Sequence, residues 1–199
     1  MIKPDFNKAV KLATKLLARQ TFEKPCISVK ELKLGNSVMF DTFENYKRIT
    51  NAPIPCQSDS ACGVTVCLGK KFLILYNEKE RNQKRLNWTL AHELGHICLR
   101  HECDGDVQEI EANFFAAQLL MPEVVINQIQ KVTGKLSYQE LCVIFGVSVQ
   151  AAKHRIKTLS VRNAKNLSSD DKIVLSKFLK HIQNYCSPFL EQGKTEVTK

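Results

Sequence analysis

Several features that define whole classes of proteins are missing from this 199-residue chain. No apolar run approaches the ~20 residues that a helix needs to cross a bilayer, so we expect no membrane-spanning helix. Residues 1–20 alternate charged and apolar positions and offer no continuous apolar stretch or cleavage site, which argues against a secretory signal. Internal repeats and low-complexity tracts are absent as well. With 44% apolar and 25% charged residues, the composition is that of a globular chain.

No pair of the eight cysteines has the C-x-x-C spacing of a structural zinc site. Cys56, Cys62 and Cys67 lie close together in sequence, but the gaps between them fit no standard metal-binding pattern. Because no export signal is seen, we expect the cysteines to be free thiols in a reducing compartment. The sequence therefore predicts a cytoplasmic protein with buried or indifferent thiols, and the alternative is a metal or redox role for them.

Acidic residues are fewer than basic ones, 20 against 29, and the formal charge is +9. Such an excess suggests nucleic-acid binding, but it is unevenly distributed. Residues 1–123 hold 17 basic and 15 acidic residues, whereas residues 124–199 hold 12 and 5. The length favours one domain with a small appendage. We predict a nearly neutral domain over residues 1–123 and a basic, all-helical part over residues 124–199.

Hydrophobic spacing predicts an α+β fold with a small sheet and several helices. Residues 63–68 and 71–76 are rich in β-branched and aromatic side chains and flank Gly69-Lys70, so they predict a β-hairpin. Residues 21–62 read as short strands and loops, and the tail from residue 187 as frayed. The predicted helices cover residues 5–20, 86–101, 107–120, 122–132, two segments within 137–159, and 168–185.

The most informative segment is His92-Glu93-Leu94-Gly95-His96, an H-E-x-x-H motif inside a predicted helix. Residues four apart lie on one helix face, so the two imidazoles can converge on one Zn²⁺ ion. Glu93 is offset around the helix and can reach a metal-bound water without being a ligand, as a general base requires. The alternative is a chance match with two surface histidines, but the apolar residues around the motif indicate a buried helix, where histidines need partners.

A third metal ligand is expected from the next predicted helix. Glu109 and Asn113 are four apart and share a face, so Glu109 can bind zinc while Asn113 orients a ligating histidine. Glu111 lies about 200° around the helix from Glu109, so both carboxylates cannot reach one metal. We prefer Glu109 to Glu111. The alternative is an ordinary amphipathic helix with solvated glutamates.

Together, AHELGHICLRH and E-x-E-A-N-x-F-A-A-x-L-L-M-P resemble the ImmA/IrrE metallopeptidase family. The resemblance implies a zincin-like fold of the gluzincin type, with zinc on His92, His96 and Glu109 and with Glu93 as general base. Related gluzincins carry Glu-x-x-Ala-Asp on the ligand helix. This chain has Asn113 in the last place.

The resemblance also implies a function: a zinc endopeptidase that cleaves a regulatory protein, namely a helix-turn-helix repressor of a mobile element or stress regulon. No further sensor domain follows residue 185, which looks like the mobile-element anti-repressor branch. The alternative is a DNA-binding or repressor-binding regulator that uses a zincin scaffold without proteolysis.

Residues 137–159 resemble a helix-turn-helix, with Gly146 at the turn and Ser148 as the cap of the second helix. Two interpretations stay open for this pair: packing or protein docking, and direct DNA binding. Several polar or basic side chains of the second helix are available for DNA phosphates: Gln150, Lys153, His154, Arg155 and Lys157.

Residues 72–76 are expected to form an edge strand beside the active-site helix, where a substrate backbone would pair with it. The alternative is a plain core strand. The group that would stabilise an oxyanion stays open among Tyr76, Arg100 and His101. His101 also fits the C-terminal end of its helix, where the helix dipole favours a histidine.

Overall fold

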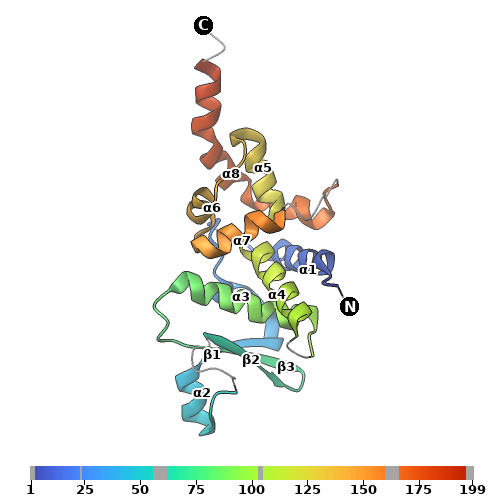
Figure 1. Ribbon diagram of the computed structural model, residues 1–199, viewed down its shortest axis with the longest axis vertical. Helices are drawn as coiled ribbons and strands as arrows, with labels where there is room; N and C mark the ends of the chain where they lie inside the picture. The colour runs from blue at the N-terminus through green and yellow to red at the C-terminus, as the bar shows by residue number, and fades with distance from the viewer. Residues whose placement is uncertain (1–2, 23, 56–61, 103–104, 160–165, 196–199) are drawn as a thin grey trace. The chain divides into compact units, whose positions relative to one another are not determined.

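The computed structural model describes residues 3–22, 24–55, 62–102, 105–159 and 166–195 (Figure 1). It is α+β and mostly helical, as predicted, with one small sheet. The strands are β1 (Val38–Thr42), β2 (Gly63–Leu68) and β3 (Lys71–Tyr76). The α-helices are α1 (Phe6–Ala18), α2 (Phe43–Thr50), α3 (Gln83–Leu99), α4 (Asp106–Leu120), α5 (Glu123–Thr133), α6 (Tyr138–Phe145), α7 (Val149–Leu159) and α8 (Ser169–Thr195).

The chain forms two compact units. Unit 1 contains Met1–Leu12 and Ser28–Ala116, and unit 2 contains Ala13–Ile27 and Ala117–Lys199. The functional division between residues 123 and 124 stays a prediction. In the described part of the chain, every helix is too short or too polar to cross a membrane.

The sheet of unit 1 has the order β1-β3-β2. The predicted hairpin is confirmed, since β2 and β3 pair antiparallel on either side of Gly69-Lys70. β1 pairs parallel with the opposite side of β3. β3 is therefore the central strand, and Ile74 and Leu75 on it are fully buried.

The expectation that residues 72–76 form an edge strand is therefore wrong. β1 lies in the region expected to hold short strands and loops, but its pairing with β3 and the helix α2 that directly follows it were not anticipated. Its main chain hydrogen-bonds to the edge of β3 that β2 leaves open, with Val38 to Thr42 in register with Phe72 to Tyr76. β2 is the edge strand on the other side of β3.

Helix α3 carries the H-E-x-x-H motif and packs closely against α4 within unit 1. A Cβ atom on Gly95 would lie 3.1 Å from the carbonyl oxygen of Ala112 and 3.2 Å from its Cα. The absence of a side chain at Gly95 thus lets the two backbones approach. Leu90 and Leu94 bury the same helix in the core.

In unit 2, α6 and α7 form the predicted helix pair. Gly146 turns between them with φ +65°, and the Ser148 hydroxyl accepts the backbone N–H of Ala151 at 3.2 Å. Arg155 was expected on the polar face of α7, but it is fully buried. Its guanidinium donates to the Met121 carbonyl at 2.9 Å and is unavailable to DNA.

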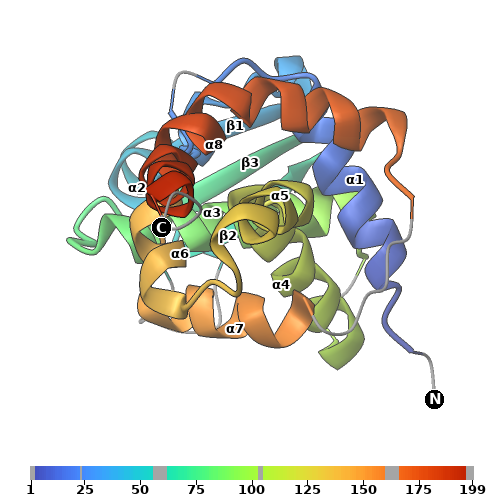
Figure 2. The same cartoon turned by 90° about the horizontal axis from the view of Figure 1, so that it is seen from above.

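Helix α8 packs along α5 within unit 2 (Figure 2). It continues to Thr195, beyond the predicted end at residue 185, so residues 187–195 are helical where a frayed tail was expected. Residues 196–199 lie outside the described residues. Pro188 lies inside the helix and cannot donate to the carbonyl of Asn184. The hydroxyl of Ser187 donates to that carbonyl at 3.1 Å instead, which explains how the helix tolerates the proline.

Candidate metal centre

Three side chains from α3 and α4 meet in unit 1. The Nε2 atoms of His92 and His96 are 3.0 Å apart, as helical spacing over four residues allows. The Glu109 carboxylate reaches both rings: Oε2 is 3.3 Å from His92 Nε2, and Oε1 is 3.3 Å from His96 Nε2. Both histidines are mostly buried, whereas the Glu109 side chain is 47% exposed. The centre is therefore reachable from solvent.

The opposite nitrogen of each ring is held by another side chain. His92 Nδ1 lies 3.1 Å from Asn113 Oδ1, the partner predicted from the spacing of Glu109 and Asn113. An amide oxygen only accepts, so His92 carries its proton on Nδ1 and presents a lone pair at Nε2. This bond fixes the tautomer that a metal ligand needs.

His96 is held by a longer chain of groups that the sequence did not reveal. Its Nδ1 is 3.1 Å from His101 Nδ1, and His101 Nε2 is 2.9 Å from Glu111 Oε2. The carboxylate accepts the His101 Nε2 proton, so His101 Nδ1 can accept from His96 Nδ1. His96 Nε2 is then also a lone pair facing Glu109.

The N-terminal segment anchors this chain of groups. The backbone N–H of Asp5 donates to Glu111 Oε1 at 2.6 Å, while the ammonium of Lys8 donates to the carbonyl of Leu99 at 3.0 Å. The spacing of Glu109 and Glu111 indicated that they point in different directions, and the structure places them so. The contact between Glu111 and Asp5 spans 106 residues, and no local pattern would have shown it.

Three acceptor atoms thus converge: two imidazole lone pairs and a carboxylate. Their separations of 3.0 to 3.3 Å match the edges of a coordination tetrahedron, which are about 3.3 Å for bonds of about 2.0–2.1 Å. Acceptors repel at such distances unless a cation lies between them. His92, His96 and Glu109 form a group suited to hold a metal ion, and the donor set of two imidazoles and one carboxylate suits zinc.

Glu93 lies beside this group but outside the donor triangle. The Thr65 hydroxyl on β2 donates to Glu93 Oε2 at 2.7 Å. Gly63, at the start of β2, allows this approach, because a Cβ there would lie 2.9 Å from Thr89 Cγ2. The sequence did not point to Thr65, because β3 rather than β2 was the strand expected beside the site.

Of the three candidates for stabilising an oxyanion, His101 contacts Nδ1 of His96, whereas Nε2 of His96 is the ring nitrogen that faces His92. Arg100 is exposed and takes a left-handed conformation with φ +61° at the end of α3. The ring of Tyr76 lies beneath the ammonium of Lys30, 3.7 Å from the ring centre.

Cys98 lies on α3, two residues after His96. Burial raises the pKa of this thiol to about 11, so it is neutral near pH 7. All six described cysteines are free. Cys56 and Cys103, the remaining two, lie outside the described residues.

Comparison with curated proteins finds no match for the chain. The sequence model of the Peptidase_M78 family, described as the IrrE N-terminal-like domain, matches residues 58–157. The matched region is just over half of the chain and contains β2, β3, and α3 to α7 up to residue 157. It confirms the resemblance carried by the two motifs: this chain belongs to the IrrE N-terminal-like family of metallopeptidases.

Proposed function

We propose that the protein is a zinc-dependent endopeptidase of the gluzincin type. His92, His96 and Glu109 hold the metal, and Glu93 is the general base. The observation that carries the proposal is the convergence of three acceptors, with the opposite nitrogen of each histidine already bound to a neighbouring side chain. Membership of a metallopeptidase family supports it.

A bound zinc ion supplies Lewis acidity, which polarises a peptide carbonyl and lowers the pKa of a water molecule to about 7. The Glu93 carboxylate takes a proton from the attacking water and returns it to the leaving amine. Thr65 holds Glu93 Oε2 by a hydrogen bond and so fixes the direction of the carboxylate. Asn113 and His101 keep the protons of His92 and His96 on Nδ1.

The substrate backbone would pair with β2. In the described sheet β2 has a partner strand on one side only, and Thr65 on this strand touches the proposed base. An extended peptide added to this edge would gain main-chain hydrogen bonds close to Glu93. β2 thus takes the role that the sequence analysis gave to residues 72–76.

The substrate is proposed to be a regulatory protein of the cytoplasm: a helix-turn-helix repressor of a mobile element or stress regulon. The support is the resemblance of the two motifs to ImmA/IrrE peptidases. The test is to incubate the zinc-loaded protein with the repressor encoded beside its gene and follow cleavage by electrophoresis and mass spectrometry. We expect defined fragments with wild type and no fragments with Glu93→Gln.

The Glu93→Gln variant should still bind zinc with wild-type stoichiometry, because Glu93 lies outside the donor triangle. Thr65→Val should slow cleavage while zinc binding is retained. Equal cleavage by wild type and Glu93→Gln would rule out the proposed chemistry. Intact repressor together with hydrolysis of another protein would remove only the substrate assignment.

The alternative is a regulator that binds DNA or the repressor without cutting it. The observation in its favour is the exposed polar face of α7, which carries Gln150, Lys153, His154 and Lys157. Burial and the charges of Lys157 and Arg155 lower the pKa of His154, so this histidine adds little positive charge near pH 7. DNA binding that weakens with salt and survives His92→Ala would support this alternative.

A further inference from the structure

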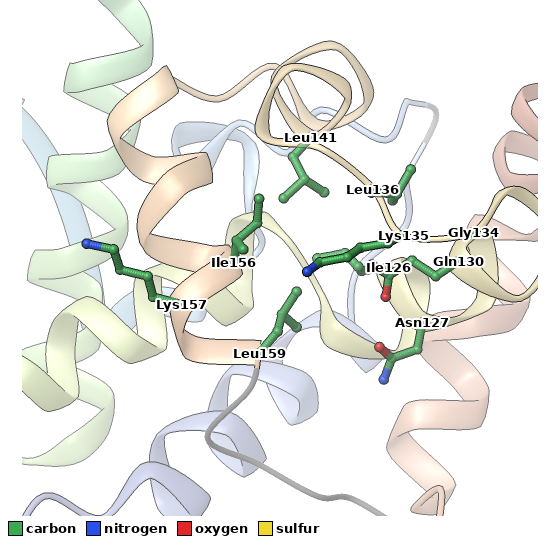
Figure 3. A pocket seen from close by; sticks show the side chains of 10 residues that line it. All are labelled: Ile126, Asn127, Gln130, Gly134, Lys135, Leu136, Leu141, Ile156, Lys157 and Leu159. Carbon is green, nitrogen blue, oxygen red and sulfur yellow. The ribbon is translucent and has the colours of Figure 1, made fainter.

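The residues of unit 2 line a hollow that the proposed chemistry does not use. It is a cavity of about 670 Å³ among α5, the α5–α6 connection, α6 and α7, which we name the α5–α7 cavity (Figure 3). Five of its ten lining residues are aliphatic: Ile126, Leu136, Leu141, Ile156 and Leu159. Its volume falls within the ~300–1,000 Å³ range of small-molecule sites, which are mostly apolar with a few polar groups.

The polar groups of the cavity are not evenly distributed. Lys135 extends from the α5–α6 connection across the middle of the cavity, toward Ile156 and Leu159, whereas Lys157 points away (Figure 3). The carboxamides of Asn127 and Gln130 lie toward the α5 side (Figure 3). The lining residues include no aspartate or glutamate. The cavity therefore combines an apolar wall with one ammonium and two carboxamides.

The ammonium of Lys135 makes no ion pair with any acidic group in the part of the chain that the structure describes. A cation over an aliphatic wall is complementary to an anion that carries an aliphatic chain. Its carboxylate would accept from Lys135, and carboxamide N–H groups could add to the same head group. The chain would replace water against Ile156 and Leu159, the two of these side chains that are partly exposed.

We propose that the α5–α7 cavity binds a small aliphatic monocarboxylate, with its carboxylate on Lys135 and its hydrocarbon chain along the partly exposed Ile156 and Leu159. This site is independent of the proposed peptidase function.

The test is isothermal titration calorimetry of the full chain with sodium decanoate. We expect saturable binding of one decanoate per chain. Octanoate, two methylenes shorter, should bind roughly tenfold more weakly. Decanol, which lacks the charge, should bind about fivefold more weakly than decanoate. Glu93→Gln should bind decanoate like wild type, so failure of the peptidase proposal would leave this result unchanged.

Lys135→Gln should weaken decanoate binding by about fivefold without changing decanol binding. The matched control is Lys172→Gln, which removes an exposed lysine of α8 outside the cavity and should have no effect. Methyl NMR should show decanoate-dependent shifts at Ile126 and Ile156 and none at Ile74 of unit 1.

Three results would overturn the proposal: no saturable binding, equal affinity for decanoate in Lys135→Gln and wild type, or shifts confined to methyl groups outside the cavity. A fourth would reassign the cavity to protein docking. In that case a helical peptide of leucine and glutamate would shift the Ile126 and Ile156 methyls, and decanoate would not.

Discussion

Each unit contains a cluster of polar side chains, which is buried around Arg155 in unit 2 and partly exposed at Glu109 in unit 1, and the two differ in whether they include a cation. In unit 2, the guanidinium of Arg155 donates to the Gln118 side chain and to the Met121 carbonyl, and Gln118 in turn donates to Thr14 at 3.0 Å. This cluster contains its own cation. In unit 1, His92, His96 and Glu109 present acceptors to one another at 3.0 to 3.3 Å without a cation of the chain between them.

The difference separates a structural cluster from a binding site. A buried polar group costs free energy unless it is paired, so a cluster complete in itself needs nothing from outside. A cluster of converging acceptors is satisfied only by an added cation. Arg155 therefore stabilises the fold, whereas the histidines and Glu109 are arranged to take a metal ion. The following variants test that distinction, from the largest expected effect to the smallest.

Loss of a converging acceptor should have the largest effect. His96→Ala removes one of the three proposed ligands, so we expect zinc affinity to fall by more than the roughly 100-fold upper range for loss of an outer hydrogen-bond partner. Peptidase activity should be lost with it. Zinc content after dialysis, measured by atomic emission, checks this. A folded His96→Ala protein that retains one zinc per chain would show that the acceptor triangle is not the metal centre.

Loss of the internal cation should affect stability and leave the metal site intact. Arg155→Met leaves the buried Met121 carbonyl without its side-chain donor and takes one of two donors from the Gln118 amide oxygen, which still accepts from the Glu123 N–H at 3.2 Å. This change should cost about 3–5 kcal/mol of unfolding free energy. Urea denaturation measures this. Lys157→Met, an exposed change on the same helix, should cost under about 0.5 kcal/mol. If the two variants were equally stable, the Arg155 cluster would not be a structural element.

Loss of a group that orients a proposed zinc ligand should have an intermediate effect on the zinc affinity of unit 1. Glu111→Gln weakens the acceptor of His101, which orients His96, so zinc affinity should fall by about 10–100-fold. Competition with a chelator measures it. Glu102→Gln, an exposed neighbour, is the control and should bind zinc like wild type. Wild-type affinity in Glu111→Gln would mean that His96 is oriented without the His101–Glu111 pair.

The parts of this site that sequence alone indicated are those set by local helix geometry. The spacing of His92 and His96, and the opposed directions of Glu109 and Glu111, follow from 3.6 residues per turn. The structure brings Glu109 to the two histidines accordingly. The roles of these residues as zinc ligands stay predictions, to be decided by metal analysis.

The parts that sequence did not indicate depend on contacts between distant segments. β3 became central because β1, more than twenty residues earlier, pairs with it. Arg155 was assigned to the surface because a charged side chain is rarely buried, yet the acceptors that bury it come from residues 118 and 121. No helical or strand period encodes such pairings.

The smallest effect should come from the loss of a helix cap at the surface of unit 2. Glu140 and Ser137 form a capping box at the start of α6, with the Ser137 N–H donating to Glu140 Oε2 at 2.8 Å. This backbone hydrogen bond is the main reason that the pKa of Glu140 lies below its ordinary value. Glu140→Ala should cost about 1 kcal/mol near pH 7.

The sign of the pH dependence follows from the lowered pKa of Glu140. A carboxylate that is stabilised in the folded state contributes above its unfolded pKa of about 4.3, and this contribution is lost as the pH falls through the folded value. The difference between wild type and Glu140→Ala should thus be larger near pH 7 than near pH 3 in urea denaturation. Gln139→Ala, an exposed neighbour without the cap, should show no such pH-dependent difference. A Glu140→Ala difference that stayed constant with pH would mean that the ionised carboxylate is not what caps α6.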